Sequence, residues 1–144
     1  MRVAEIMARN VITIPGDATL VEAAELMSEH NIGFLPVITA DVLVGVLTDR
    51  DIVVRGLGEG KNPYTTLVRS VMSSEPVWCY DDDVLTDTVD ILTNRHVRRL
   101  VVVDNNNNLC GLLSLDDLAA HMSSDRLLSG VIRELSAGSC SGGL

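Results

Sequence analysis

The sequence is poor in aromatic residues and in positive charge, and both shortages narrow what the protein can do. Aromatic residues make up 3% of the chain, so the core must be built from aliphatic side chains, as in sheets covered by helices. The net charge is −9 at pH 7. Nucleic acid and anionic membrane surfaces reward clustered positive charge, so we expect neither as the main partner. A small anion needs only a local basic site and is not excluded.

Long hydrophobic runs and paired cysteines are also missing. No apolar run reaches the roughly 18 residues that a membrane span requires, and charged residues interrupt the N-terminus, which lacks the shape of a signal peptide. The three cysteines form no Cys-x-x-Cys pair, so neither a disulfide framework nor a cysteine zinc site is indicated. The three histidines are far apart in the sequence. We therefore expect no bound metal, no membrane association and a reduced, cytoplasmic setting.

The sequence does contain an internal repeat. Residues 45–52, Gly-Val-Leu-Thr-Asp-Arg-Asp-Ile, match residues 111–118, Gly-Leu-Leu-Ser-Leu-Asp-Asp-Leu, in the glycine, the hydroxyl and the last Asp. Upstream, the pattern of 32–38 recurs at 97–103. The offset is 65 residues upstream and 66 at the last block, because the asparagine run at 105–108 lengthens a turn. A period this long exceeds the usual solenoid range of roughly 20–50 residues and predicts two tandem subdomains.

Each copy predicts the order strand, helix, strand, strand, helix. The first helix opens with the capping box Thr19-x-x-Glu22, and the acidic run 81–83 is expected to cap its counterpart in the second copy. The first copy predicts elements at 11–14, 19–30, 34–38, 43–47 and 48–56, and the second at 77–80, 84–94, 100–103, 109–113 and 115–121.

The Gly-rich stretch in the middle of the chain sets the expected boundaries. We expect a first subdomain over 1–55, a linker over 56–67, a second subdomain over 68–122, and a short helix with a flexible tail over 123–144. Within that last segment, a helix is expected at 125–135, followed by a disordered Gly- and Ser-rich end.

At these residues the chain resembles the CBS domain family, named after cystathionine β-synthase. The resemblance rests on Gly45-x-x-Thr48-x-x-Asp51, on Ile-Gly-Phe-Leu-Pro at 32–36 and on their second copies, and it covers roughly residues 3–122. The segment Thr48-Asp-Arg-Asp51 before a Gly-rich linker is similar to stand-alone bacterial two-CBS proteins, including the mycobacterial hypoxic response proteins.

The resemblance implies an α/β (α+β) fold. Two repeats, each β-α-β-β-α, would pack by pseudo-twofold symmetry as a Bateman module. It also implies two clefts, which in the family often hold AMP, ADP, ATP or S-adenosylmethionine, and a homodimer.

The repeated hydroxyl–Asp element suits a nucleotide. An ionised carboxylate accepts hydrogen bonds at two oxygens, so Asp51 or Asp117 can take both ribose hydroxyls. Free N–H groups in the first turn of a helix keep the carboxylate ionised and suit a nearby phosphate, which Thr48 or Ser114 can also reach. The same spacing is an ordinary helix cap, a hydroxyl at the N-cap with an acid three residues later. Ligand binding and capping can coexist.

A phosphate requires positive charge, which gathers at residues 95–99, Arg-His-Val-Arg-Arg. Arg98 and Arg99 stand where the first copy has Gly33 and Phe34, and family members that bind nucleotides often carry basic side chains at these positions. The planar fork of arginine suits phosphate oxygens. The alternative is that these arginines pair with the acidic surface.

We therefore expect two unequal clefts, each combining side chains of one copy with a wall from the other. The candidate ligand-binding residues of the better-formed cleft are Ser114, Asp116, Asp117, Arg98, Arg99, Ile12, Gly33 and Phe34, and those of the other are Thr48, Arg50, Asp51, Val77 and Val97. Asp116 places an extra acid beside the expected phosphate.

The sequence predicts a regulatory module that binds an adenosine nucleotide or a related adenosyl ligand between the repeats, with no required cofactor. The alternative is a ligand-free module for dimerisation or protein docking, and the downstream protein partner is not specified. No Ser–His–Asp, Cys–His or paired-carboxylate arrangement predicts catalysis, so we do not expect an enzyme.

Overall fold

Two compact units make up the chain in the computed structural model, which describes residues 1–121. We call residues 12–76 the first-repeat unit, and residues 1–11 together with 77–121 the second-repeat unit. The helix and the tail predicted at 125–135 and 136–144 lie outside the described residues.

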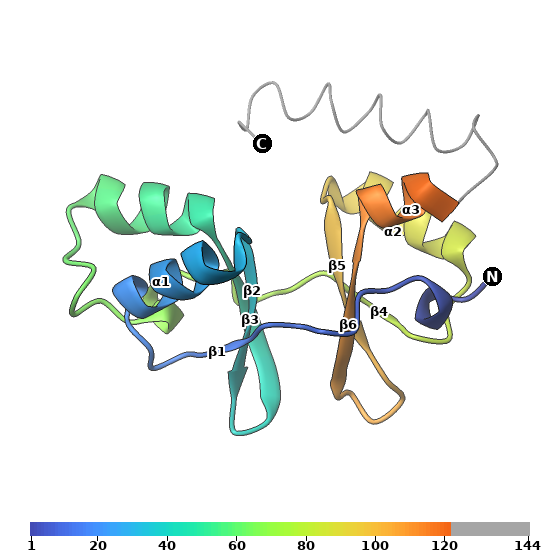
Figure 1. The fold of residues 1–144 in the computed structure, drawn as a ribbon, viewed down its shortest axis with the longest axis horizontal. Coiled ribbons are helices and arrows are strands. Elements are labelled where there is room, and N and C mark those ends of the chain that lie inside the picture. The colour runs from blue at the N-terminus through green and yellow to red at the C-terminus, as the bar shows by residue number, and fades with distance from the viewer. Residues whose placement is uncertain (122–144) are drawn as a thin grey trace. The chain divides into compact units, whose positions relative to one another are not determined.

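The first-repeat unit is a three-stranded sheet with helices on one face (Figure 1). Its order is β1-β2-β3, with β1 parallel and β3 antiparallel to the central strand β2. The elements are β1 (Ile14–Pro15), α1 (Leu20–His30), β2 (Phe34–Thr39), β3 (Val42–Thr48) and the short helices η2 (Asp51–Gly56), η3 (Leu57–Glu59) and η4 (Val68–Ser70). The predicted order is confirmed, although the helix after β3 is a π-helix over Asp51–Gly56.

The second-repeat unit has the same architecture. Its sheet has the order β4-β5-β6, again with one parallel and one antiparallel pair. Each central strand shifts register once, between Val37 and Ile38 and between Val102 and Val103, which are equivalent positions. The elements are η1 (Val3–Glu5), β4 (Trp78–Tyr80), α2 (Leu85–Arg95), β5 (Arg99–Val103), β6 (Leu109–Ser114) and α3 (Leu115–His121).

The two long helices begin differently. Helix α1 has the predicted cap, since the Thr19 hydroxyl accepts a hydrogen bond from the Glu22 amide at 3.2 Å. The expected acidic cap of α2 is wrong: its N-cap is Val84, with no side-chain cap. The nearest acid is already used, because Asp83 Oδ2 accepts from the Tyr80 amide at 2.9 Å and closes the turn before the helix.

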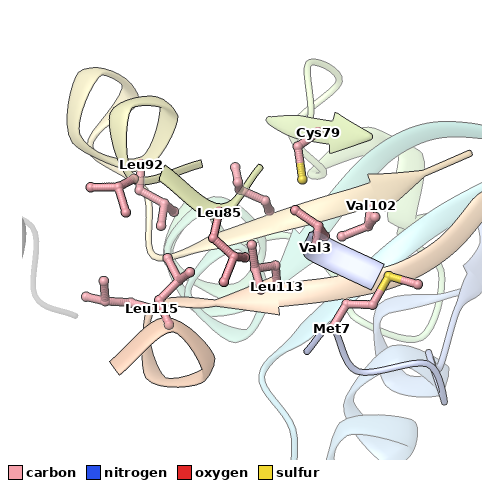
Figure 2. Packing of buried hydrophobic residues seen from close by; sticks show 11 residues of the cluster. Val3, Met7, Cys79, Leu85, Leu92, Val102, Leu113 and Leu115 are labelled. Carbon is pink, nitrogen blue, oxygen red and sulfur yellow. The ribbon is translucent and has the colours of Figure 1, made fainter. Parts of the chain in front are cut away.

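Each unit includes the segment that precedes the other repeat. Val3 and Met7 lie in the core of the second-repeat unit and point at the same cluster as Leu113 (Figure 2). Ala8 and Leu112 exchange backbone hydrogen bonds of 2.9 Å. The compact units therefore change over at residues 11/12 and 76/77, whereas the sequence repeat suggests boundaries at 55 and 68.

The first-repeat unit likewise includes the segment that precedes the second repeat in the sequence. Val68 and Val71 are fully buried in its core, and Val46 and Ser73 exchange backbone hydrogen bonds of 2.9 Å. The buried hydrophobic side chains of both cores are aliphatic or sulfur-containing, as the shortage of aromatic residues predicts. None of the helices in residues 1–121 combines the length and apolar character that crossing a bilayer requires.

Candidate functional site

The two hydroxyl–Asp elements have the same geometry. In the first copy the Thr48 amide donates to Asp51 Oδ2 at 3.0 Å, and the Asp51 amide donates to the Thr48 hydroxyl at 3.1 Å. Ser114 and Asp117 form the same pair at 3.0 and 3.1 Å. Both copies are thus reciprocal helix caps, which confirms the capping interpretation. An ionised carboxylate has about four acceptor sites, so capping leaves capacity for a ligand.

The surroundings of the two aspartates differ. Asp51 Oδ1 lies 3.9 Å from Arg55 Nη1, and Arg55 also donates to the Met72 carbonyl at 3.3 Å. The equivalent of Arg55 in the second copy is His121, whose Nδ1 lies 3.0 Å from the backbone carbonyl of Asp117. The carboxylate in the first copy therefore has a cation near its outer oxygen, while the side chain at the same place in the second copy contacts backbone.

A pocket lies at the start of β5 and the end of β6. It is a small depression open to solvent, with a cavity volume of about 20 Å³. Strand pairing sets Arg99 opposite Ser114, and the Leu115 amide donates to the Arg98 carbonyl at 2.9 Å. Four of the predicted site residues meet here together with Leu115, and we call this group the second-repeat pocket: Arg98, Arg99, Ser114, Leu115 and Asp116.

The equivalent place in the first-repeat unit has the same backbone and different side chains. Phe34 pairs with Thr48, and the Asp49 amide donates to the Gly33 carbonyl at 3.0 Å. The Asp49 carboxylate lies over Gly33, since a Cβ added to that glycine would be 2.5 Å from Asp49 Oδ2. The repeated motif Thr48-x-x-Asp51 leaves position 49 unspecified. The available signal was its equivalence to the apolar Leu115.

Of the remaining predicted residues, three pack against the cores and one is exposed. Ile12 is half-buried against the core of the first-repeat unit, and Val77 and Val97 are half-buried against that of the second-repeat unit. Arg50 is exposed at the start of the helix after β3. Both predicted clefts combine residues of the two units, so their assembly stays a prediction.

Within residues 1–121, the titratable side chains form neither a metal-binding cluster nor a reactive thiol site. No group of three or more His, Cys, Asp or Glu residues there could hold a metal ion. Burial, reinforced by Asp83, raises the pKa of the Cys79 thiol to about 12. Because the thiolate is the reactive form, Cys79 is an inert core residue at neutral pH.

Comparison with known proteins gives a consistent assignment. The model of the CBS domain matches residues 3–57 and again 68–124. The CBS domain-containing protein YhcV of Bacillus subtilis is 37% identical over 134 residues, which are 93% of this chain and 94% of that protein. Hypoxic response protein 1 of Mycobacterium tuberculosis is 32% identical over 119 residues, or 82% of each chain.

Solved structures have the same fold. The CBS domain protein TA0289 of Thermoplasma acidophilum superposes with a TM-score of 0.81 at 27% identity, over 93% of this chain and 75% of that one. CBSX2 in complex with AMP has a TM-score of 0.72 at 28% identity, over 83% and 93%. The CBS domain pair of MJ0100, in complex with 5′-methylthioadenosine and S-adenosylmethionine, has a TM-score of 0.74 over 90% and 97%. Its 23% identity indicates likeness of fold alone.

Proposed function

The chain belongs to the CBS domain family, and from this premise we propose a regulatory module that binds an adenosine nucleotide. In this proposal the second-repeat pocket receives the phosphate end, and Asp117 accepts hydrogen bonds from the ribose. AMP, ADP and ATP are the candidate ligands, with S-adenosylmethionine as an adenosyl ligand without phosphate. The module reports occupancy without catalysis.

One observation carries the proposal: two arginines and a hydroxyl line one pocket, against a single acid, Asp116, in a protein with a net charge of −9. Guanidinium groups bind phosphate oxygens in a bidentate fashion, and these charge-assisted bonds are stronger than neutral ones. A structural relative supports the ligand class, because CBSX2, at 28% identity, was solved in complex with AMP.

The position of Asp117 supports a ribose contact. Its Oδ2 accepts from the Ser114 amide, which holds the carboxylate in the first turn of α3, next to the pocket. The other oxygen retains its acceptor sites. Each charge-assisted hydrogen bond to a ribose hydroxyl would contribute about 1.5–3 kcal/mol.

The first experiment is calorimetric titration of folded, ligand-free protein with AMP, ADP, ATP and S-adenosylmethionine. We expect at least one nucleotide to bind, and at 100 times its dissociation constant to raise the unfolding free energy by about 2.7 kcal/mol. The proposal would be overturned if none of the four ligands gave a saturable binding isotherm and none changed the melting temperature.

A variant pair tests the pocket itself. We expect Arg98→Ala/Arg99→Ala to weaken nucleotide affinity by roughly tenfold or more, since about 1.4 kcal/mol is a factor of ten. Arg95→Ala is the matched control, because Arg95 is also exposed and basic but does not line the pocket. An equal loss in the control would show that general charge, and not the pocket, attracts the nucleotide.

Homodimer formation is a second candidate function. Three apolar side chains in η2 and η3 lie within a stretch of five residues and are exposed: Val53 (58%), Val54 (46%) and Leu57 (52%). Exposed apolar patches mark interaction sites. A second copy of the chain is the proposed occupant. Light scattering should give a dimer mass for the wild type and a monomer mass for Val53→Ser/Leu57→Ser. Tyr64→Ser, at another exposed apolar position, should stay dimeric.

A further inference from the structure

We propose that Asp49 is a specificity-determining residue that closes the first-repeat counterpart of the pocket to phosphate. The chain would then bind a phosphate-bearing ligand at its second repeat only. This inference rests on the proposed function and adds the number of sites and the residue that sets it.

The two places can be compared directly because their strand ends and the turns into the following helix match, although that helix is a π-helix in the first repeat and an α-helix in the second. Phe34 pairs with Thr48 as Arg99 pairs with Ser114. Asp49 donates its amide to the Gly33 carbonyl at 3.0 Å, and Leu115 donates to the Arg98 carbonyl at 2.9 Å. At this corner the difference in ligand preference is therefore sought in the side chains.

The side chains exchange an arginine for a carboxylate at one point in space. A Cβ at Gly33, where the second copy has Arg98, would lie 2.5 Å from Asp49 Oδ2 and 2.9 Å from Asp49 Cγ. The space that begins the arginine side chain in one unit is thus filled by an acid in the other. At the position of Asp49 the second copy has Leu115, which is 5% exposed and packs into the core.

Charge explains why this exchange selects against anions. A phosphate held at the first-repeat counterpart would meet the Asp49 carboxylate, and like charges brought together in a binding site are strongly unfavourable. The second-repeat pocket also has an acid, Asp116, but there two arginines line the same pocket and offset it. The counterpart also has Phe34 in place of Arg99, so both guanidinium forks are replaced. Arg50 is the basic side chain that remains between the two acids of the motif.

A local structural role for Asp49 makes a different prediction. Its Oδ1 accepts from the Arg50 amide at 2.8 Å, so the residue also orders the turn into the helix. Loss of that contact would change stability and would alter binding of charged and uncharged ligands alike. Comparison of ADP with adenosine, which lacks phosphate, separates the two roles.

The experiment transfers the second-repeat arrangement to the first repeat. The starting protein is Arg98→Ala/Arg99→Ala, in which ADP affinity is expected to be weakened by roughly tenfold or more. Adding Gly33→Arg with Asp49→Ser should restore ADP affinity by roughly tenfold or more and leave adenosine affinity unchanged. Gly33 has no positive φ, so its backbone accepts an arginine. Adding Gly33→Arg alone should restore nothing, because the new guanidinium would pair with Asp49.

Calorimetry gives the outcomes, with circular dichroism checking that each variant folds. Wild-type protein should bind one ADP per chain. Two equivalent ADP molecules per wild-type chain, or no recovery in the folded transfer variant, would overturn this inference and leave the proposed function standing. If the wild type bound none of AMP, ADP, ATP and S-adenosylmethionine, both would be overturned. Should the transfer variant not fold, Asp49→Lys in the wild type is the second test, because it removes the acid and supplies a cation: a second, weaker ADP site is expected, and a stoichiometry still at one would overturn the inference.

Discussion

The two repeats agree in their hydroxyl–Asp caps and in their strand register, and they differ in the side chains at the corner where an anion would bind. Both helix caps have hydrogen bonds of 3.0 and 3.1 Å, and both central strands shift register at equivalent residues. At the same corner, one unit has Arg98 and a buried Leu115, and the other has Gly33 under Asp49. The comparison indicates that one strand-and-cap framework accommodates different charges at its exposed corner.

The largest expected effect tests which residues complete which unit. Val3 and Val68 are both fully buried, each in the core of the unit formed by the other repeat's strands. Val3→Asp and Val68→Asp should each cost more than about 3 kcal/mol, because an unpaired charge is buried. In hydrogen exchange, Val3→Asp should remove protection from 77–121 first, and Val68→Asp from 14–56. If each substitution removed hydrogen-exchange protection only from the repeat that contains it in the sequence, the assignment of these residues to the other unit would be wrong.

The next effect concerns the two capping aspartates. Asp117→Asn should weaken nucleotide affinity by about tenfold to a hundredfold, the loss of one charge-assisted bond of about 1.5–3 kcal/mol. Asp51→Asn should change it little, since the first-repeat counterpart is closed to phosphate. Asparagine keeps an oxygen that can cap the helix, so melting temperatures serve as the control. Equal losses of affinity in calorimetry would mean that both repeats bind.

Alkaline pH should distinguish the cores. Cys79 occupies the strand position that is Ile14 in the first-repeat unit, and both are buried. In the unfolded chain the thiol ionises near its ordinary pKa of 9.0, while the folded one keeps its proton up to a pKa of about 12. The folded protein therefore holds more protons between pH 9 and 12, and its stability falls as pH rises, by up to about 1.4 kcal/mol per pH unit.

Urea unfolding at pH 8 and pH 10.5 measures this slope. Cys79→Ala should start less stable at pH 8 and lose less on going to pH 10.5. Cys110→Ala is the control, because burial raises the pKa of that more exposed thiol as well, and its effect on the slope should be smaller. A slope unchanged by Cys79→Ala would remove this difference between the units.

The smallest effect should be equal in the two repeats. Thr48→Ala and Ser114→Ala each remove one cap and should cost about 1 kcal/mol of unfolding free energy without ligand. With ADP present, Ser114→Ala should fall further behind, because it also loses a pocket hydroxyl. Different costs in the ligand-free protein would show that the two caps are not equivalent despite their geometry.

Local patterns predicted much of this molecule. The spacing Thr48-x-x-Asp51 and its copy predicted reciprocal caps, and period-two and helical patterns predicted the strands and helices within a few residues. The arginine pair and Ser114 were expected near one another and do line one pocket. The predicted acidic cap of α2 is absent because Asp83 accepts a hydrogen bond from the Tyr80 amide instead. Residue spacing alone does not show whether an Asp will cap the following helix or bond to the turn before it.

By itself, the sequence determined the repeat, the order of the elements and the chemistry of the hydroxyl–Asp caps, because these depend on contacts within about four residues. Only the tertiary structure decided that residues 1–11 complete the second-repeat unit, that Cys79 is sealed in a core and that Asp49 covers Gly33. Those contacts join residues many positions apart. They exist only after the strands pair and the chain closes, so no local pattern encodes them.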